Sequence, residues 1–117
     1  MRTWLEVDED HESCVTVTVQ GGCAFNRADD LWDAAENALQ IAVGRVVILD
    51  LWAVTTFDIG CIQSLHQIMA DTSRRHLDLY LVLRPGSALA QYATWSGATT
   101  PFPVFPTHSA ALLATAF

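Results

Sequence analysis

The stretch Arg45-Val-Val-Ile-Leu-Asp-Leu-Trp-Ala-Val-Thr-Thr-Phe-Asp58-Ile-Gly-Cys-Ile-Gln-Ser-Leu65 decides the fold. Its first part, Val46–Leu49, is a continuous β-branched and aliphatic run, typical of a short strand buried on both faces. The two threonines that follow predict a turn, after which the carboxylate of Asp58 can cap a helix by accepting from unpaired backbone N–H groups. Such a junction is where α/β folds usually place their working surface. The predicted helix has one apolar face, formed at spacings of three, three and four by Ile59, Ile62, Leu65 and Met69.

The N-terminal part of the chain predicts a hairpin and a helix. Trp4–Val7 and Cys14–Val19 flank an acidic segment and have the composition of paired strands. In the second strand, valines alternate with Thr16 and Thr18, so one face is packed and the other is more polar. Gly21-Gly22 predicts a turn after this strand. Leu31, Ala34, Ala35, Ala38, Leu39 and Ala42 then form the buried stripe of a helix.

The C-terminal part continues the alternation of strands and helices. A strand over 45–51, a helix over 58–75 and a strand over 77–83 make a β-α-β unit with parallel strands. Ser87 and Thr107 each predict the N-cap of a further helix. The order β-β-α-β-α-β-α-β-α predicts a single α/β domain over residues 1–117, with a mixed sheet of four or five strands and helices packed mainly on one face.

Composition excludes several classes of function. The chain has a net charge of −7 and six arginines but no lysine, which argues against a nucleic-acid-binding protein. No apolar stretch of about 18 residues predicts a membrane span, and the N-terminus lacks the apolar core of a signal peptide. The four histidines lie far apart without ligand spacing, so neither a metal site nor a cofactor is predicted. We therefore expect a cytoplasmic protein.

The order and spacing of three segments resemble the STAS domain family, the fold of bacterial anti-sigma factor antagonists. Asp50-Leu-x-x-Val54-x-x-Phe57-Asp58 before a helix resembles the family signature Asp-Leu-Ser-Gly-Val-x-x-Ile-Asp-Ser-Ser-Gly-Leu. Leu79–Leu83 followed by Arg84-Pro-Gly is similar to the next strand and its turn. Phe102–Thr107 followed by Ala110–Ala116 resembles the last strand and closing helix. The resemblance extends over nearly the whole chain.

The chain departs from the family pattern at the residues that the resemblance makes most important. In the family, the second of the paired serines is the phosphoacceptor. Aligned without gaps, the first serine becomes Ile59, the phosphoacceptor becomes Gly60, and the following glycine becomes Cys61. The acidic residue that the family carries after its second strand is also missing from Gly21-Gly-Cys-Ala24. The resemblance therefore implies a STAS-like scaffold without its usual phosphorylation switch.

The resemblance implies a non-catalytic regulatory module that binds an anti-sigma factor or a related kinase-type protein. Alternatives are an accessory STAS subunit of a transporter or signalling complex, a STAS domain that binds a small molecule or nucleotide, and a thiol enzyme. The sequence leaves the oligomeric state open. The partner-binding residues carried over from the family are Asp58, Ile59, Gly60, Cys61, Gln63, Ser64 and Gln67.

Two residues near the decisive stretch allow more than one interpretation. Cys61 stands near the positive end of the helix dipole, which favours a reactive thiolate, or it fills a tight strand–helix corner. The odd number and the spacing of the three cysteines predict three free thiols without a disulfide. Trp52 either covers the end of the sheet or serves as an exposed aromatic anchor for a partner.

Overall fold

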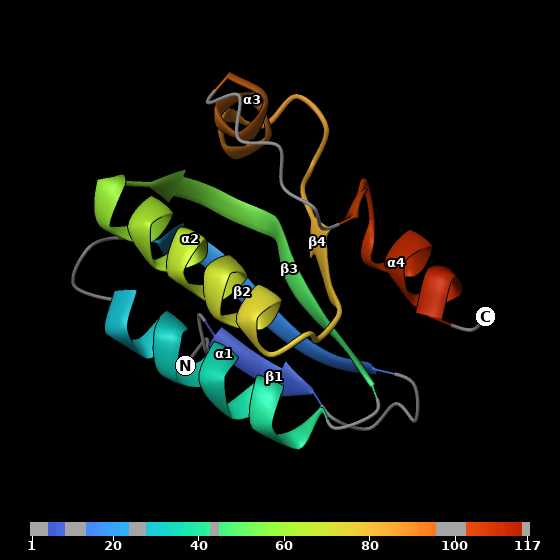
Figure 1. Cartoon of the computed structure of the whole chain (residues 1–117). Helices are drawn as coiled ribbons and strands as arrows, with labels where there is room; N and C mark the ends of the chain where they lie inside the picture. Colours follow the sequence, from blue (N-terminus) through green and yellow to red (C-terminus); the bar gives the residue numbers. More distant parts are fainter. Residues whose placement is uncertain (1–4, 9–13, 24–27, 43–44, 96–102, 116–117) are drawn as a thin grey trace.

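The computed structural model describes residues 5–8, 14–23, 28–42, 45–95 and 103–115. These residues form five strands and four helices in the predicted alternating order (Figure 1). The elements are β1 (Leu5–Asp8), β2 (Cys14–Cys23), α1 (Ala28–Ile41), β3 (Val46–Phe57), α2 (Ile59–Arg74), β4 (Leu79–Val82), α3 (Ala88–Trp95), β5 (Val104–Phe105) and α4 (His108–Thr115).

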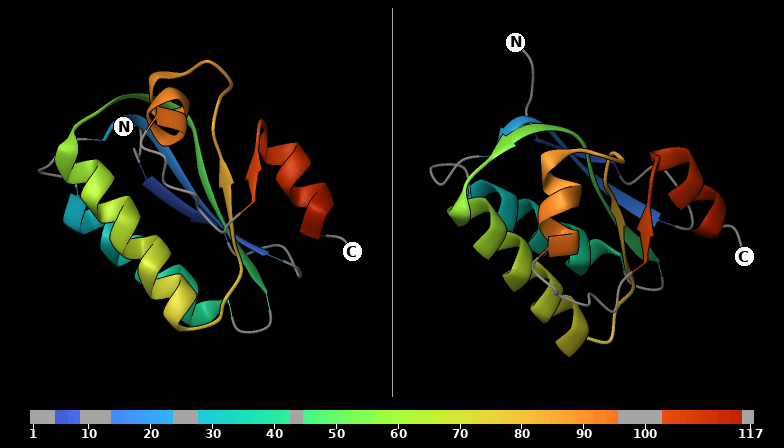
Figure 2. Two further views of the ribbon diagram at one scale, coloured as in Figure 1. Left: turned by 45° about the horizontal axis from the view of Figure 1, so that its top comes forward. Right: turned by 90° about the horizontal axis from the view of Figure 1, so that it is seen from above.

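The strands form one mixed sheet in the order β1-β2-β3-β4-β5. Strand β1 is antiparallel to β2, and each of the other neighbouring pairs is parallel. Helices α1 and α2 lie side by side on one side of this sheet, whereas α4 lies away from them beside β4 and β5 (Figures 1 and 2). The predicted fold class, including the hairpin and the parallel β-α-β unit, is confirmed.

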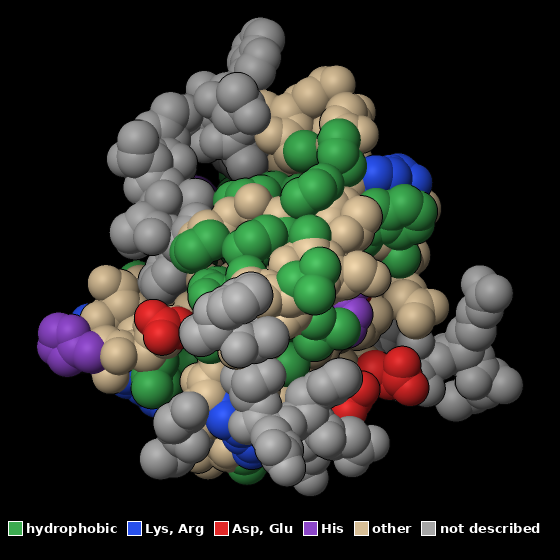
Figure 3. Space-filling model, turned by 90° about the vertical axis from the view of Figure 1, so that its right-hand side faces the viewer, with side chains coloured by type: hydrophobic (Ala, Val, Ile, Leu, Met, Phe, Trp, Pro, Cys, Tyr) green, Lys and Arg blue, Asp and Glu red, His purple; other side chains and the backbone are tan. Residues whose placement is uncertain are grey.

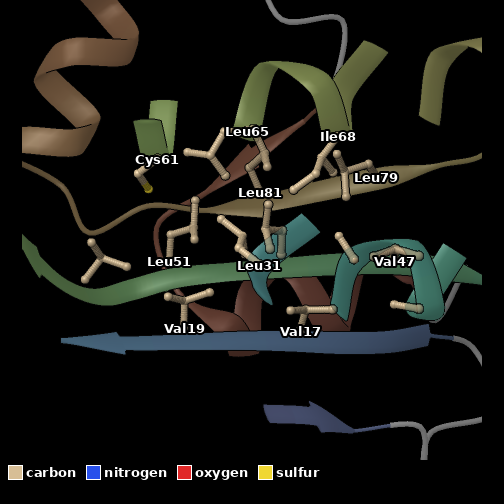
Figure 4. Packing of buried hydrophobic residues seen from close by; sticks show 14 of the residues in the cluster. Val17, Val19, Leu31, Val47, Leu51, Cys61, Leu65, Ile68, Leu79 and Leu81 are labelled. Carbon is tan, nitrogen blue, oxygen red and sulfur yellow. The ribbon is translucent and has the colours of Figure 1, made fainter. Parts of the chain in front are cut away.

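The main core lies between the sheet and the pair α1 and α2 (Figure 4). Alternation along β2 and β3 directs one set of side chains to this face, as the two-residue period of a strand requires. From α2, Ile62 and Leu65 pack on it as their spacing predicted, Met69 is partly buried there, and Ile68 joins them. Ile59, predicted on the same apolar face, is 67% exposed, so that part of the prediction was wrong. The strand side chains in this core include Val15, Val17, Val19, Val47, Leu49 and Leu51.

The opposite face of the sheet carries a smaller core under α4. Ile48, between Val47 and Leu49 in sequence, points to this second face and is fully buried. It packs in a cluster with Cys14, Val82 and Ala111, of which Ala111 comes from α4. The second face is thus covered in part by a helix of only eight residues.

The C-terminal end of α2 is closed by a regular capping motif. His76 has a positive φ of 55°, and its N–H donates to the carbonyl of Ser73. The N–H of Leu77 donates to the carbonyl of Thr72 at 3.2 Å. These two hydrogen bonds make a Schellman motif, with histidine instead of glycine in the left-handed position.

Ion pairs join the same end of α2 to α1. The Asp71 carboxylate is 2.8 Å from Arg74 and 3.2 Å from Arg75, and Arg75 also pairs with Glu36 of α1. The hydrogen bond with Glu36 is the main cause that raises the pKa of Arg75, and the Asp71 charge adds to it. Arg75 therefore stays charged and links the two helices.

Strand β3 is longer than the sequence predicted. Thr55 and Thr56 continue the strand rather than forming a turn, and β3 ends at Phe57. Gly21-Gly22 does not form a turn either, because β2 continues through it and pairs with β3 as far as Cys23 and Phe57. Register shifts lie between Thr18 and Gln20 and between Gly21 and Gly22. These irregularities let the ladder continue past the point where the sequence alone indicates a break.

None of the helices described here has the length and hydropathy needed to cross a bilayer.

Candidate functional site

The corner between β3 and α2 is built on Asp58. This residue has extended dihedrals, φ −126° and ψ −178°, and its Oδ1 accepts from the Cys61 N–H at 3.1 Å. Its backbone carbonyl accepts from the N–H of Ile62 at 3.2 Å. Asp58 is therefore the N-cap of α2, and this prediction is confirmed.

The first two helical residues after the cap differ sharply in exposure. Ile59 is 67% exposed, although it directly precedes the buried residues of the first turn of α2. Gly60 is buried within the first turn of α2. It is not among the glycines with positive φ, so an L-residue is compatible with its backbone conformation.

The remaining predicted partner-binding residues separate by helical position. Gln63 and Gln67 are exposed and follow Ile59 at intervals of four, so the three side chains lie along one face of α2. Together we call these three residues the α2 ridge. Cys61 and Ser64 are buried, at 1% and 5% exposure, and present no side chain to a partner in this structure. The predicted set thus contains an exposed ridge and buried residues beneath it.

Cys61 is disulfide-bonded, so the prediction of three free thiols was wrong. Its sulfur points into the core, near Leu51 and Leu65 in Figure 4. Cys14 keeps its thiol and is fully buried at the other end of β2. Spacing along the chain could not reveal the bond, because the distance between cysteines depends on which strands and helices lie together.

Trp52 projects from the sheet face that α4 covers only in part. Its side chain is 43% exposed, and the Arg84 guanidinium lies 5.3 Å from the centre of its ring. The backbone N–H of Trp52 donates to Asp50 Oδ1 at 3.1 Å. This exposure fits the role of an aromatic anchor for a partner better than that of a cover over the end of the sheet.

Beside Trp52 lies an open cavity of about 260 Å³. Seen from the α4 side, hydrophobic side chains gather across the middle of this part of the surface (Figure 3). His108 is fixed by a 3.1 Å contact between its Nε2 and Thr16 Oγ1. The polar residues that alternate along β2 were the one signal of this surface in the sequence, and they did not indicate that α4 lies over it. The cavity is lined by Thr18, Gln20, Asp50, Trp52, Ala53, Thr107 and His108.

Comparison with known protein families gives one match, the STAS domain, over residues 7–111. No curated protein matches the chain in sequence.

Three solved structures of anti-sigma factor antagonists share the fold and are distant in sequence. A putative anti-sigma factor antagonist from Thermotoga maritima has 14% identity and a TM-score of 0.76, with 97% of this chain and 93% of that chain covered. An anti-sigma factor antagonist from Mycobacterium paratuberculosis has 22% identity, the same TM-score and the same coverage. The anti-sigma factor antagonist SpoIIAA in its unphosphorylated form has 8% identity and a TM-score of 0.70, with 96% of each chain covered. At these identities, the likeness is one of fold.

Proposed function

The chain belongs to the STAS domain family, and we propose that it is a non-catalytic regulatory module of the anti-sigma factor antagonist type. Its partner is a protein of the anti-sigma factor or kinase class, and its place of action is the cytoplasm. Three structural neighbours, named as anti-sigma factor antagonists, support this class.

The observation that carries the proposal is the exposed isoleucine at the start of α2. A partner that covers this large aliphatic side chain gains binding energy by removing its apolar surface from water. Ile59 has glutamines rather than charges along the α2 ridge, so a partner can bury it without removing a charge from water. The cap at Asp58 fixes the helix that presents it.

Binding at this ridge proceeds without the family's phosphorylation switch. A phosphoserine carries about two negative charges, which disrupt an apolar contact at that position. Gly60 has no hydroxyl to accept a phosphate. Ser64 is one helical turn further along α2 and is 5% exposed, so it does not replace the missing acceptor. We propose that the α2 ridge is competent for binding whenever this corner is folded.

The test compares two aspartate substitutions on a matched pair of exposed aliphatic residues. Ile59 on α2 is 67% exposed and Leu113 on α4 is 68% exposed. Affinities are measured by calorimetry against the anti-sigma factors encoded in the source genome. Ile59→Asp should weaken binding by roughly tenfold or more, the usual loss for an interface anchor. Leu113→Asp should leave it unchanged. Equal effects of the two substitutions on binding would show that the ridge is not the interface.

The cavity beside Trp52 favours one second candidate, a STAS domain that binds a small molecule or nucleotide. The cavity combines an aromatic side chain with the hydrogen-bonding groups of Asp50 and His108. Aromatic walls with a few polar groups are typical of small-molecule sites. Calorimetry with nucleotides tests this candidate. If the natural protein binds a nucleotide and Trp52→Ala does not, the cavity is the binding site.

A further inference from the structure

The cavity beside Trp52 brings an aromatic ring and a carboxylate together on one face of the sheet. Asp50 and Trp52 are two residues apart on β3, so their side chains project from the same face, about 6.6 Å apart along the strand. Thr18 pairs with Asp50 across the neighbouring strand β2 and lines the same cavity. Thr107 and His108, at the start of α4, form another side of it.

We propose that this cavity binds a small organic cation of the guanidinium or primary ammonium class. The apolar part of the ligand lies on Trp52, and its N–H groups donate to Asp50. This ligand class rests on the second candidate function, a STAS domain that binds a small molecule. It is independent of partner binding at the α2 ridge.

Asp50 supplies the acidic group of the cavity, and its own strand holds it in position. Its Oδ1 accepts from the backbone N–H of Trp52 at 3.1 Å. A carboxylate has two oxygens with about four lone-pair sites, so this bond leaves capacity for the donors of a ligand. Cationic N–H groups make shorter and stronger hydrogen bonds to a carboxylate than neutral donors do. A cation is therefore favoured at Asp50, whereas an anion is repelled.

Trp52 supplies the apolar surface of the cavity and also attracts positive charge. The face of an indole ring is the negative part of its quadrupole and binds cations. One such contact is present already, because the Arg84 guanidinium lies 5.3 Å from the centre of the ring. Arg84 is not among the described residues that line the cavity, so this contact lies outside it.

The surrounding charge also favours a cation. Glu6 of β1 lies directly opposite Thr18, and Thr18 lies opposite Asp50, so the Glu6 side chain projects from the same face of the sheet. Glu6 is exposed, and the whole chain has a net charge of −7. Negative potential over a concave surface raises the local concentration of cations.

The neutral polar groups of the lining favour a cation that carries N–H donors. The hydroxyl of Thr18 and the amide oxygen of Gln20 can accept such donors, which a quaternary ammonium lacks. The 3.1 Å contact between His108 Nε2 and Thr16 Oγ1 fixes the imidazole beside them. The volume of about 260 Å³ lies just below the usual range for ligand pockets, so the ligand is small.

The first measurement is a calorimetric titration of the full chain with agmatine, which has a guanidinium at one end and a primary ammonium at the other. Asp50→Asn keeps the size of the side chain and an acceptor for the Trp52 N–H but removes the charge, so it should weaken binding by roughly tenfold or more. Trp52→Ala should weaken it by a similar factor. Ile59→Asp, which alters the α2 ridge, should bind agmatine as the natural protein does.

Arg84→Gln separates a cation site from an anion site. It removes the positive charge beside Trp52, so agmatine should bind equally well or more tightly, whereas an anionic ligand would bind more weakly. Butylurea, an uncharged analogue of similar shape, should bind the natural protein at least roughly tenfold more weakly than agmatine. In NMR spectra of the natural protein, agmatine should shift the amide signals of Thr18 and Trp52, which locates the ligand without any substitution.

Three results would overturn the ligand class. They are the absence of agmatine binding at millimolar concentrations, equal binding by Asp50→Asn, and equal affinity for butylurea. If agmatine binds but shifts neither Thr18 nor Trp52, the cavity is not its site and the assignment is wrong. If a nucleotide binds in a way that depends on Trp52 while agmatine does not bind, the second candidate function is supported and only the ligand class is overturned.

Discussion

The two ends of helix α2 are held by different kinds of interaction. At the C-terminal end, the Schellman motif at His76 closes the helix, Asp71 pairs with Arg75, and Arg75 also pairs with Glu36, which ties the helix to α1. At the N-terminal end, the structure centres on the cap Asp58 and the disulfide-bonded Cys61. The C-terminal contacts reach α1, whereas the cap hydrogen bond at the N-terminal end joins residues that are three apart.

The C-terminal end of α2 therefore mainly stabilises the fold, whereas the N-terminal end presents the proposed binding surface. The C-terminal end exposes arginines and polar groups, which water solvates well. The N-terminal end exposes Ile59, which gains stability only when another surface covers it. An end held by a small number of strong local contacts can also respond when one of them is removed. The predictions below test this contrast, beginning with the largest expected effect.

Reduction of the disulfide should have the largest effect on stability. The disulfide at Cys61 holds the first turn of α2, so its loss should lower the free energy of unfolding by roughly 2–4 kcal/mol. Urea titrations of the oxidised and reduced natural protein measure this difference without changing the sequence. Cys14→Ala serves as the control and should keep the same difference between redox forms. Coincident titration curves for the two forms of the natural protein would contradict the prediction.

At the C-terminal end, Asp71→Asn should have the next largest effect. Asp71 is 7% exposed and pairs with two arginines, so loss of its charge should cost about 1–2 kcal/mol. Arg74→Gln is the matched control, because the Arg74 side chain is 75% exposed and such pairs contribute less than about 1 kcal/mol. Urea titration at low and high salt checks both values. Equal losses in the two variants would show that the buried carboxylate has no special role.

The N-cap should contribute a smaller amount. Asp58→Ala removes the acceptor for the Cys61 N–H and should cost about 1 kcal/mol, the typical value for a lost cap. Thermal unfolding of the oxidised protein gives the value with the disulfide intact. Thr107→Ala removes the corresponding cap of α4, where Thr107 Oγ1 accepts from Ala110, and is the comparison variant. If Asp58→Ala abolishes partner binding at unchanged stability, Asp58 contacts the partner and is not merely a cap.

Local sequence signals predicted the elements at this corner well. The hydrophobic run at 46–49 gave the buried strand, and the carboxylate at Asp58 gave the helix start, because both effects act over a few residues. The continuation of β3 through Thr55 and Thr56 could not be read in this way. It depends on pairing with Gly22 and Cys23 of β2, across a register shift that no pattern in β3 indicates.

The same distinction explains which parts of the candidate site were predicted. Helical spacing placed Ile62 and Leu65 correctly on the packed face of α2. It placed Ile59 there too, but the structure shows Ile59 exposed on the face that Gln63 and Gln67 share. The disulfide at Cys61 and the cavity over Asp50 depend on contacts between segments far apart in the chain. Periodicity gives the direction of a side chain relative to its own element, but not which distant residue it meets.

The smallest structural effect is expected for Gly60→Ser, which nevertheless gives the sharpest test of the missing switch. Gly60 has a negative φ in the first turn of α2, so serine should change stability by less than about 0.5 kcal/mol if its side chain is accommodated. Incubated with ATP and an anti-sigma kinase, the natural protein should gain no phosphate, and Gly60→Ser should gain one. Intact-mass spectrometry followed by peptide mapping measures both. A phosphate on the natural protein within residues 55–64 would contradict the loss of the switch, because Thr55 and Thr56 are exposed there and carry hydroxyls. If the serine variant is phosphorylated and its ridge still binds the partner unchanged, this corner is not the interface, since about two negative charges beside Ile59 must weaken an apolar contact.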